Sequence, residues 1–176
     1  MFTLGKRQSV KYFSDILRVN DEPVPFHNQG EMKIKLTKDT LVNKQQYGIV
    51  ILNGAKERWV GGVYSDGVIA ASVRQIGAEY TVSSDNVAPV ITAVQPQQWE
   101  KQSKISIKLS DNKSGIKSYR GTIDGEFVLF EHDMKSPVYT YKFDSSRLKK
   151  GQKHKFVFIA TDGCGNTSEY TSEFYY

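Results

Sequence analysis

The stretch RWVGGVYSDGVIAASV, residues 58–73, decides the fold class of this chain. Apolar runs at residues 59–64 and 68–73 flank a polar turn that contains Asp66 and Gly67. An Asp-Gly pair between two apolar runs is a strong signal for a β-hairpin, because the tight turn needs residues that tolerate a positive φ. The stretch therefore predicts two antiparallel strands.

The same alternation of apolar and polar residues recurs along the chain. EMKIKL (residues 31–36) and KISIKLS (residues 104–110) put apolar side chains on one face and lysines on the other, as in half-buried strands. YGIVILN (residues 47–53) is an unbroken apolar run, typical of a strand buried on both faces. Further strands are predicted at SPVYTYKF from residue 136, KHKFVFIAT from residue 153 and TSEFYY from residue 171. The only helical signal is one turn near SSRLKK, residues 145–150.

A polar segment with a proline divides these strands into two blocks. The segment is VSSDNVAPVITAV, residues 82–94, and it predicts a domain boundary after residue 86. Strands about ten residues apart, with turn residues between them, indicate β-sandwiches. We therefore predict an all-β protein of two tandem β-sandwich domains, residues 1–86 and 87–176. Because Met1 need not be the natural start, the first domain is open to being incomplete at its N-terminus.

Composition and charge argue against two kinds of partner. No apolar run approaches the roughly 20 residues of a membrane-spanning helix. The start, MFTLGKRQSVKYF, lacks the apolar stretch of a secretory signal, so an exported protein would carry its signal upstream or have lost it. The formal net charge of +5 is spread over both blocks. The first block has 11 basic and 9 acidic residues, and the second has 13 basic and 10 acidic residues. A nucleic-acid-binding protein concentrates its basic residues on one face, so we predict no nucleic-acid partner.

Five side chains are candidates for ligand binding. The densest basic cluster, RLKKGQKHK at residues 147–155, falls at a turn signal where solvated lysines are the ordinary expectation. Lys149, Lys150 and Lys153 are its candidates for contact with an anionic ligand. Trp59 and Trp99 are the aromatic candidates for stacking on a sugar or packing on a partner, although aromatic residues in strands more often belong to the core.

The sequence carries no recognisable catalytic motif. Cys164 is the only cysteine, which leaves neither an intramolecular disulfide nor a cysteine metal cluster. The three histidines lie in separate segments, and neither His-x-His nor HExxH occurs, so no zinc peptidase site is encoded. We predict no enzyme activity and no cofactor for this chain. The paired carboxylates of a glycosidase leave no local signature, and that chemistry stays open.

Two loops combine aspartate, asparagine, serine and glycine as calcium loops do. They are SDNKSGIKSYRGTIDG from residue 110 and TDGCGNTSEYTSE from residue 161. Counted from Asp111, the third position of an EF-hand loop is a lysine, whose charge would repel the ion; counted from Asp162, it is Cys164. We predict turns, because aspartate and asparagine bond their own backbone there. Asp111, Asp162 and Asn166 remain candidates for a cation site if the two loops meet.

Residues 88–176 resemble the C-terminal accessory β domains of lysostaphin-type peptidoglycan metallopeptidases of Bacteroidetes. The matching segments are APVI, SDNKSGIKSYRGTIDG, LKKGQKH and TDGCGNTS. In the first block, ERWVGGVYSDGVIAASVRQIGAEYTV is similar to the β domain that precedes this region in such proteins.

In that family the zinc domain lies N-terminal to the β domains and carries HxxxD and HxH ligands, neither of which occurs here. The resemblance implies a non-catalytic accessory region with an immunoglobulin-like second domain, exported to the periplasm or cell envelope, that supports or positions the hydrolase. The implied partners are cell-wall glycan and an upstream catalytic domain. Two alternatives are a free-standing adhesion or carbohydrate-binding module, and an enzyme with a dispersed carboxylate pair.

Overall fold

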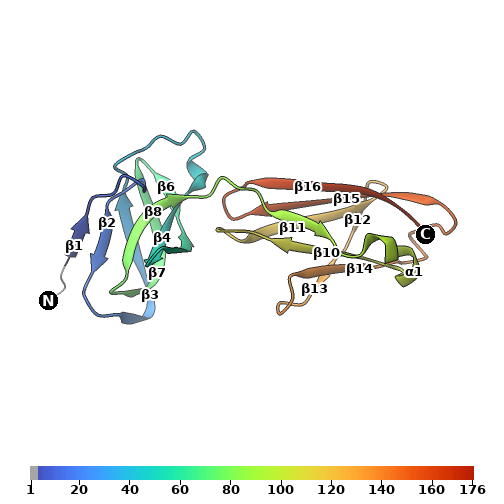
Figure 1. Ribbon diagram of the computed structural model, residues 1–176, viewed down its shortest axis with the longest axis horizontal. Helices are drawn as coiled ribbons and strands as arrows, with labels where there is room; N and C mark the ends of the chain where they lie inside the picture. The colour runs from blue at the N-terminus through green and yellow to red at the C-terminus, as the bar shows by residue number, and fades with distance from the viewer. Residues whose placement is uncertain (1–3) are drawn as a thin grey trace. The chain divides into compact units, whose positions relative to one another are not determined.

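The computed structural model describes residues 4–176 and consists mainly of β-strands (Figure 1). The chain divides into two compact units, Met1–Asn86 and Val87–Tyr176, which we name unit 1 and unit 2. Each unit is built from two sheets. The described helices are α1 (Trp99–Gln102) and two short 3₁₀ segments, η1 (Lys44–Gln46) and η2 (Pro96–Gln98). Among the residues that the structure describes, no helix combines the length and apolar character that crossing a membrane requires.

Unit 1 has a five-stranded sheet and a three-stranded sheet. The first has the order β1 (Leu4–Arg7), β2 (Ile16–Val19), β8 (Glu79–Ser84), β4 (Tyr47–Asn53), β5 (Lys56–Gly61), with β1 and β2 side by side at one edge (Figure 1). The second has the order β3 (Val24–Lys35), β7 (Val68–Ile76), β6 (Val63–Ser65). The predicted alternation at residues 31–36 is confirmed, because Ile34 and Leu36 are buried in the core while Lys33 and Lys35 are exposed.

The stretch of residues 58–73 forms the predicted hairpin, but its first strand is divided between the two sheets. β6 pairs with β7 across the turn, whereas Trp59 lies on β5, which pairs with β4 in the other sheet. The chain changes sheets at Gly61 and Gly62, whose φ angles are +89° and +142°. Glycine adopts such angles without steric cost, and a Cβ on Gly62 would lie 2.6 Å from the Ile69 side chain. The expectation of one continuous strand over residues 59–64 is therefore wrong.

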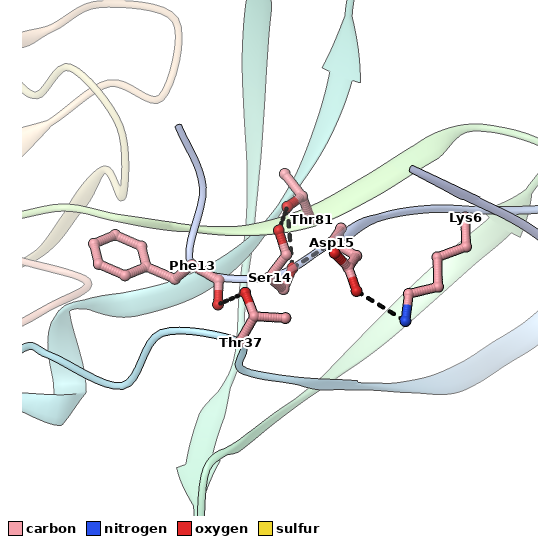
Figure 2. Close-up of polar contacts among 6 residues, drawn as sticks. All are labelled: Lys6, Phe13, Ser14, Asp15, Thr37 and Thr81. Atoms are coloured by element: carbon pink, nitrogen blue, oxygen red, sulfur yellow. Dashed lines mark hydrogen bonds and ion pairs between the residues drawn. The ribbon is translucent and has the colours of Figure 1, made fainter. Parts of the chain in front are cut away.

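A buried hydroxyl pair fastens the segment before β2 to β8 (Figure 2). Ser14 and Thr81 are fully buried, and their hydroxyl oxygens lie 3.0 Å apart. The Ser14 hydroxyl accepts the amide N–H of Val82 at 2.9 Å and donates to the carbonyl of Asp15 at 2.8 Å. The Asp15 carboxylate in turn lies 2.9 Å from the Lys6 ammonium group, as Figure 2 shows. These contacts hold β1 and β2 against the central strands.

Replacing Ser14 by alanine is expected to destabilise unit 1 by about 1–3 kcal/mol, because the buried Thr81 hydroxyl and Val82 amide would each lose a partner. Urea unfolding followed by tryptophan fluorescence measures the effect. Ser65→Ala removes an exposed hydroxyl at the end of β6 and, as the matched control, is expected to change the unfolding free energy by less than about 0.5 kcal/mol. Equal unfolding free energies for the two variants would contradict the proposed role of Ser14.

Unit 2 is an immunoglobulin-like sandwich. One sheet has the order β13 (Glu131–His132), β14 (Val138–Lys142), β10 (Lys104–Ser110), β9 (Val90–Ala93), and the other β12 (Glu126–Val128), β11 (Ile116–Ile123), β15 (Lys153–Asp162), β16 (Thr167–Tyr175). Along the chain, successive pairs of strands alternate between the two sheets, as in immunoglobulin-like folds. The predicted all-β fold with an immunoglobulin-like second domain is confirmed.

The core of unit 2 contains a tryptophan that the sequence offered as a surface residue. Trp99 is 2% exposed, and its indole N–H donates to the carbonyl of Val94 at 2.9 Å. Its ring meets the rings of Phe156 and Phe174 edge-on, at centroid distances of 5.8 and 6.5 Å. Trp99 therefore has no free face for stacking on a ligand, and its selection as a ligand-binding residue is corrected.

The short helix α1, which carries Trp99, was not predicted. It is only four residues long, too short to produce a helical period in the sequence. The predicted helical turn near residues 145–150 is present as a single turn, in which the N–H of Leu148 donates to the carbonyl of Asp144 at 2.8 Å.

Candidate functional site

A surface groove in unit 1 runs between β5 and β7. It consists of two adjoining cavities of about 420 and 590 Å³, which share Ile51, Arg58 and Gln75 as lining residues. Other residues that line it are Lys56, Glu57, Trp59 and Val60 on β5 and Ser72, Val73 and Arg74 on β7. We name it the β5–β7 groove.

Both walls of the β5–β7 groove are edges of sheets. β5 is the last strand of the five-stranded sheet. β6 pairs with β7 only from Val68 to Ala70, so no strand within the described residues pairs with that edge of β7 over residues 71–75. The other edge of β7 is occupied by β3. Open edges present backbone N–H and C=O groups to which a further strand can bond.

Cationic side chains line the groove on both walls. Lys56, Arg58 and Arg74 are exposed, and none of them forms an ion pair within residues 4–176. The carboxylate among the lining residues, that of Glu57, is engaged by the Lys11 ammonium group at 3.1 Å. The groove therefore favours anionic ligands.

Trp59, a predicted ligand-binding residue, lines the same groove. One side of its indole packs on β4, where a Cβ on Gly48 would lie 2.2 Å from the ring. Burial raises the pKa of the Tyr80 phenol in the core, and the positive charge of Arg58 lowers it in part.

The sequence patterns did not single out Arg58 and Arg74. Each looks like an ordinary polar residue of an alternating strand. The available signal was the Gly61-Gly62 pair, because adjacent glycines inside a strand pattern mark a bend or a bulge where an edge opens.

The predicted lysine candidates lie at the start of β15 and on the turn that precedes it. Lys149, Lys150 and Lys153 are all exposed. The Lys153 ammonium group is 3.7 Å from a carboxylate oxygen of Glu173, and that of Lys150 is 5.5 Å from the ring centroid of Tyr176. These contacts are those of solvated surface residues, and a ligand role for the three lysines stays a prediction.

The two aspartate-rich loops meet in unit 2, and both are turns. Asp111 Oδ1 accepts the N–H of Gly115 at 2.7 Å, and Asp162 Oδ1 accepts the N–H of Asn166 at 2.8 Å. The loops are joined where the N–H of Gly163 donates to the carbonyl of Gly115 at 3.1 Å. The prediction of turns is confirmed.

The cation candidates are also brought together. A carboxylate oxygen of Asp111 lies within 4.8 Å of one of Asp162. Asp162 is fully buried, and its Oδ2 accepts the side-chain N–H of Asn166 at 2.7 Å, so this asparagine presents a nitrogen rather than an oxygen ligand there. A cation between the loops stays a prediction.

Asp162→Ala is expected to destabilise unit 2, by about 1–3 kcal/mol for each buried donor left without an acceptor. Thermal unfolding with and without CaCl₂ and EDTA measures both this effect and any cation. Asp133→Ala, whose carboxylate accepts one backbone N–H on an exposed turn, is the control with little expected change. If Asp162→Ala unfolds at the same temperature as the wild type, the proposed role of this carboxylate is contradicted. If Ca²⁺ raises the unfolding temperature of the wild type but not of Asp162→Ala, a cation binds between the loops.

A buried histidine is held by acceptors at both ring nitrogens. His154 is 2% exposed, with Nδ1 2.6 Å from Asp124 Oδ2 and Nε2 2.8 Å from the carbonyl of Lys149. Only the imidazolium form donates at both positions. Burial opposes that charge, but the hydrogen bonds to Asp124 and the Lys149 carbonyl outweigh it and raise the pKa of His154. Burial also opposes the charge of Asp124, but hydrogen bonds from His154 and the Lys155 amide leave its pKa lowered.

This pair gives unit 2 a specific pH dependence. Folding raises the pKa of His154. The stabilisation that His154 gives unit 2 is therefore fully present below its unfolded pKa of about 6.5, and it is lost as the pH rises through the folded pKa. Folding lowers the pKa of Asp124. The stabilisation that Asp124 gives is therefore present above about pH 3.9, and it is lost as the pH falls through the folded pKa. We expect the difference in unfolding free energy between wild type and His154→Gln to be largest between about pH 4 and 6.5 and to shrink above it.

Urea unfolding at a series of pH values measures that difference. His132→Gln is the control, because it makes the same substitution at a histidine that is exposed rather than buried. A difference between wild type and His154→Gln that stays constant from acidic to alkaline pH would contradict the imidazolium geometry.

The fold and the groove define an all-β protein of two sandwich units, with cationic and aromatic side chains along one pair of sheet edges. The Zu5-like domain family matches residues 1–85, so unit 1 is similar to that family. Comparison with curated proteins finds no match. Among solved structures, fibronectin(III)-like modules of Clostridium thermocellum CbhA align with a TM-score of 0.39 and 15% identity, over 99% of this chain and 93% of that chain.

Proposed function

We propose that this chain is the non-catalytic accessory region of a cell-envelope peptidoglycan metallopeptidase, which it supports or positions on the cell wall or on a partner protein. The observation that carries the proposal is the β5–β7 groove. It joins two sheet edges, an aromatic ring and three cations that form no ion pair among residues 4–176. Such features bind another molecule rather than transform it.

The state of the reactive side chains supports a binding role. Both ring nitrogens of His154 are committed to structural contacts, and Cys164 is 2% exposed. His132 stacks on Tyr139 at a centroid distance of 4.1 Å and directs Nε2 to the carbonyl of Ser136. These groups stabilise turns and strands.

The resemblance of residues 88–176 supports the envelope context. Two of the segments that carry it, SDNKSGIKSYRGTIDG and TDGCGNTS, form the pair of turns joined through Gly163 and Gly115. In an exported hydrolase this unit would act as a rigid spacer, and unit 1 would offer the docking groove.

Fractionation of native cells, followed by a blot with antibody against this chain, tests the proposal. We expect a band in the envelope fraction, well above the mass of the 176-residue chain. We also expect the purified chain to release no soluble muropeptides from peptidoglycan, with a muralytic enzyme as the positive control. A cytoplasmic band at the mass of this chain, or release of muropeptides by the chain itself, would overturn the proposal.

A further inference from the structure

We propose that the β5–β7 groove binds an extended acidic polypeptide segment, which adds to the sheet edges as a β-strand. The inference rests on the proposed function, because it specifies the chemistry of the partner through which the accessory region docks. It is argued from three features of the groove.

The first feature is the pair of open edges. β5 is six residues long and forms the outer edge of its sheet. β7 lacks a neighbour on one side over residues 71–75 within the part of the chain that the structure describes. Main-chain N–H and C=O groups at such edges pair with another extended polypeptide backbone. A glycan strand has no matching backbone ladder, so the edges favour a peptide.

The second feature is the charge on the two walls. Lys56 and Arg58 are two positions apart on β5, so their side chains leave the same face of the strand about 6.6 Å apart. Arg74 lies on the opposite wall. Acidic side chains at alternate positions of an added strand have the same spacing, and they would meet cations that have no ionic partner among residues 4–176.

The third feature is the apolar floor. Ile51 is 8% exposed and lines both cavities, and Val60 lines one of them. Ile51 pairs with Arg58 across β4 and β5, so its side chain lies on the same face of the sheet as Lys56 and Arg58. The methylene groups of acidic side chains at every second position of an added strand would therefore lie against this floor. The groove fits a segment that carries acidic residues at alternate positions.

The test is fluorescence anisotropy of the full chain with a fluorescein-labelled hexapeptide, Val-Glu-Val-Glu-Val-Glu, which matches β5 in length. We expect saturable binding at low ionic strength. The double variant Arg58→Ala/Arg74→Ala is expected to bind at least about tenfold more weakly. Lys33→Ala/Lys35→Ala, which removes the same charge from the exposed face of β3, is the matched control and is expected to bind like the wild type.

Two further probes separate strand addition from simple charge attraction. The same peptide with alternate backbone nitrogens methylated keeps its charge but loses N–H donors, and we expect it to bind at least about tenfold more weakly. Hydrogen exchange at residues 71–75 is expected to slow when the unmodified peptide is bound. Circular dichroism of each variant confirms that it is folded.

Several results would overturn the inference. They are no anisotropy change up to about 1 mM peptide, equal binding of the methylated peptide, equal binding by the arginine variant, and displacement of the peptide by soluble peptidoglycan glycan strands at lower concentration than the peptide itself requires. None of these results alters the envelope location or the absence of muralytic activity expected above, so the two proposals fail separately.

Discussion

The positive φ angles of Gly61 and Gly62 are the constraint on which the architecture of unit 1 depends. They let one continuous segment leave the five-stranded sheet and enter the three-stranded one without a loop. A side chain on Gly62 would also collide with Ile69 on the strand it joins. Because β6 is only three residues long, it covers little of β7 and leaves the rest of that edge open. The groove is the direct result of this early change of sheet.

The alternation of residues predicted the strands and their buried faces, but it could not predict the sheet to which a strand belongs. A period of two fixes which side chains share a face, and Ile34 and Leu36 are buried as that period requires. The period does not indicate which strand lies alongside, so residues 59–64 were expected to form one continuous strand in a single sheet. The double glycine was the local sign of the change, and the exposure of Arg58 to the groove follows from it.

In unit 2 the sequence predicted the turns formed by the loops, but it did not predict which side chains are buried by residues far away in the sequence. Asp111 and Asp162 bond the backbone of their own loops, a geometry that depends on neighbours two to four residues away. Trp99 is buried against Phe156 and Phe174, which lie on strands far along the chain. His154 likewise finds Asp124 across 30 positions of sequence. No local pattern reports such contacts, so the sequence offered Trp99 as a surface residue and gave His154 no role.

The open edges of unit 1 also carry a hazard that their charges reduce. An exposed edge strand can pair with the same edge of another copy, which leads to aggregation. Antiparallel pairing of two β5 edges would bring Lys56 and Arg58 of both copies into one small region, and like charges directly opposite each other are destabilising. The same cations attract a segment of opposite charge, because complementary potentials both steer encounters and exclude wrong partners. A single set of side chains on β5 and β7 can therefore keep the edge free of its own copies and select the partner that covers it.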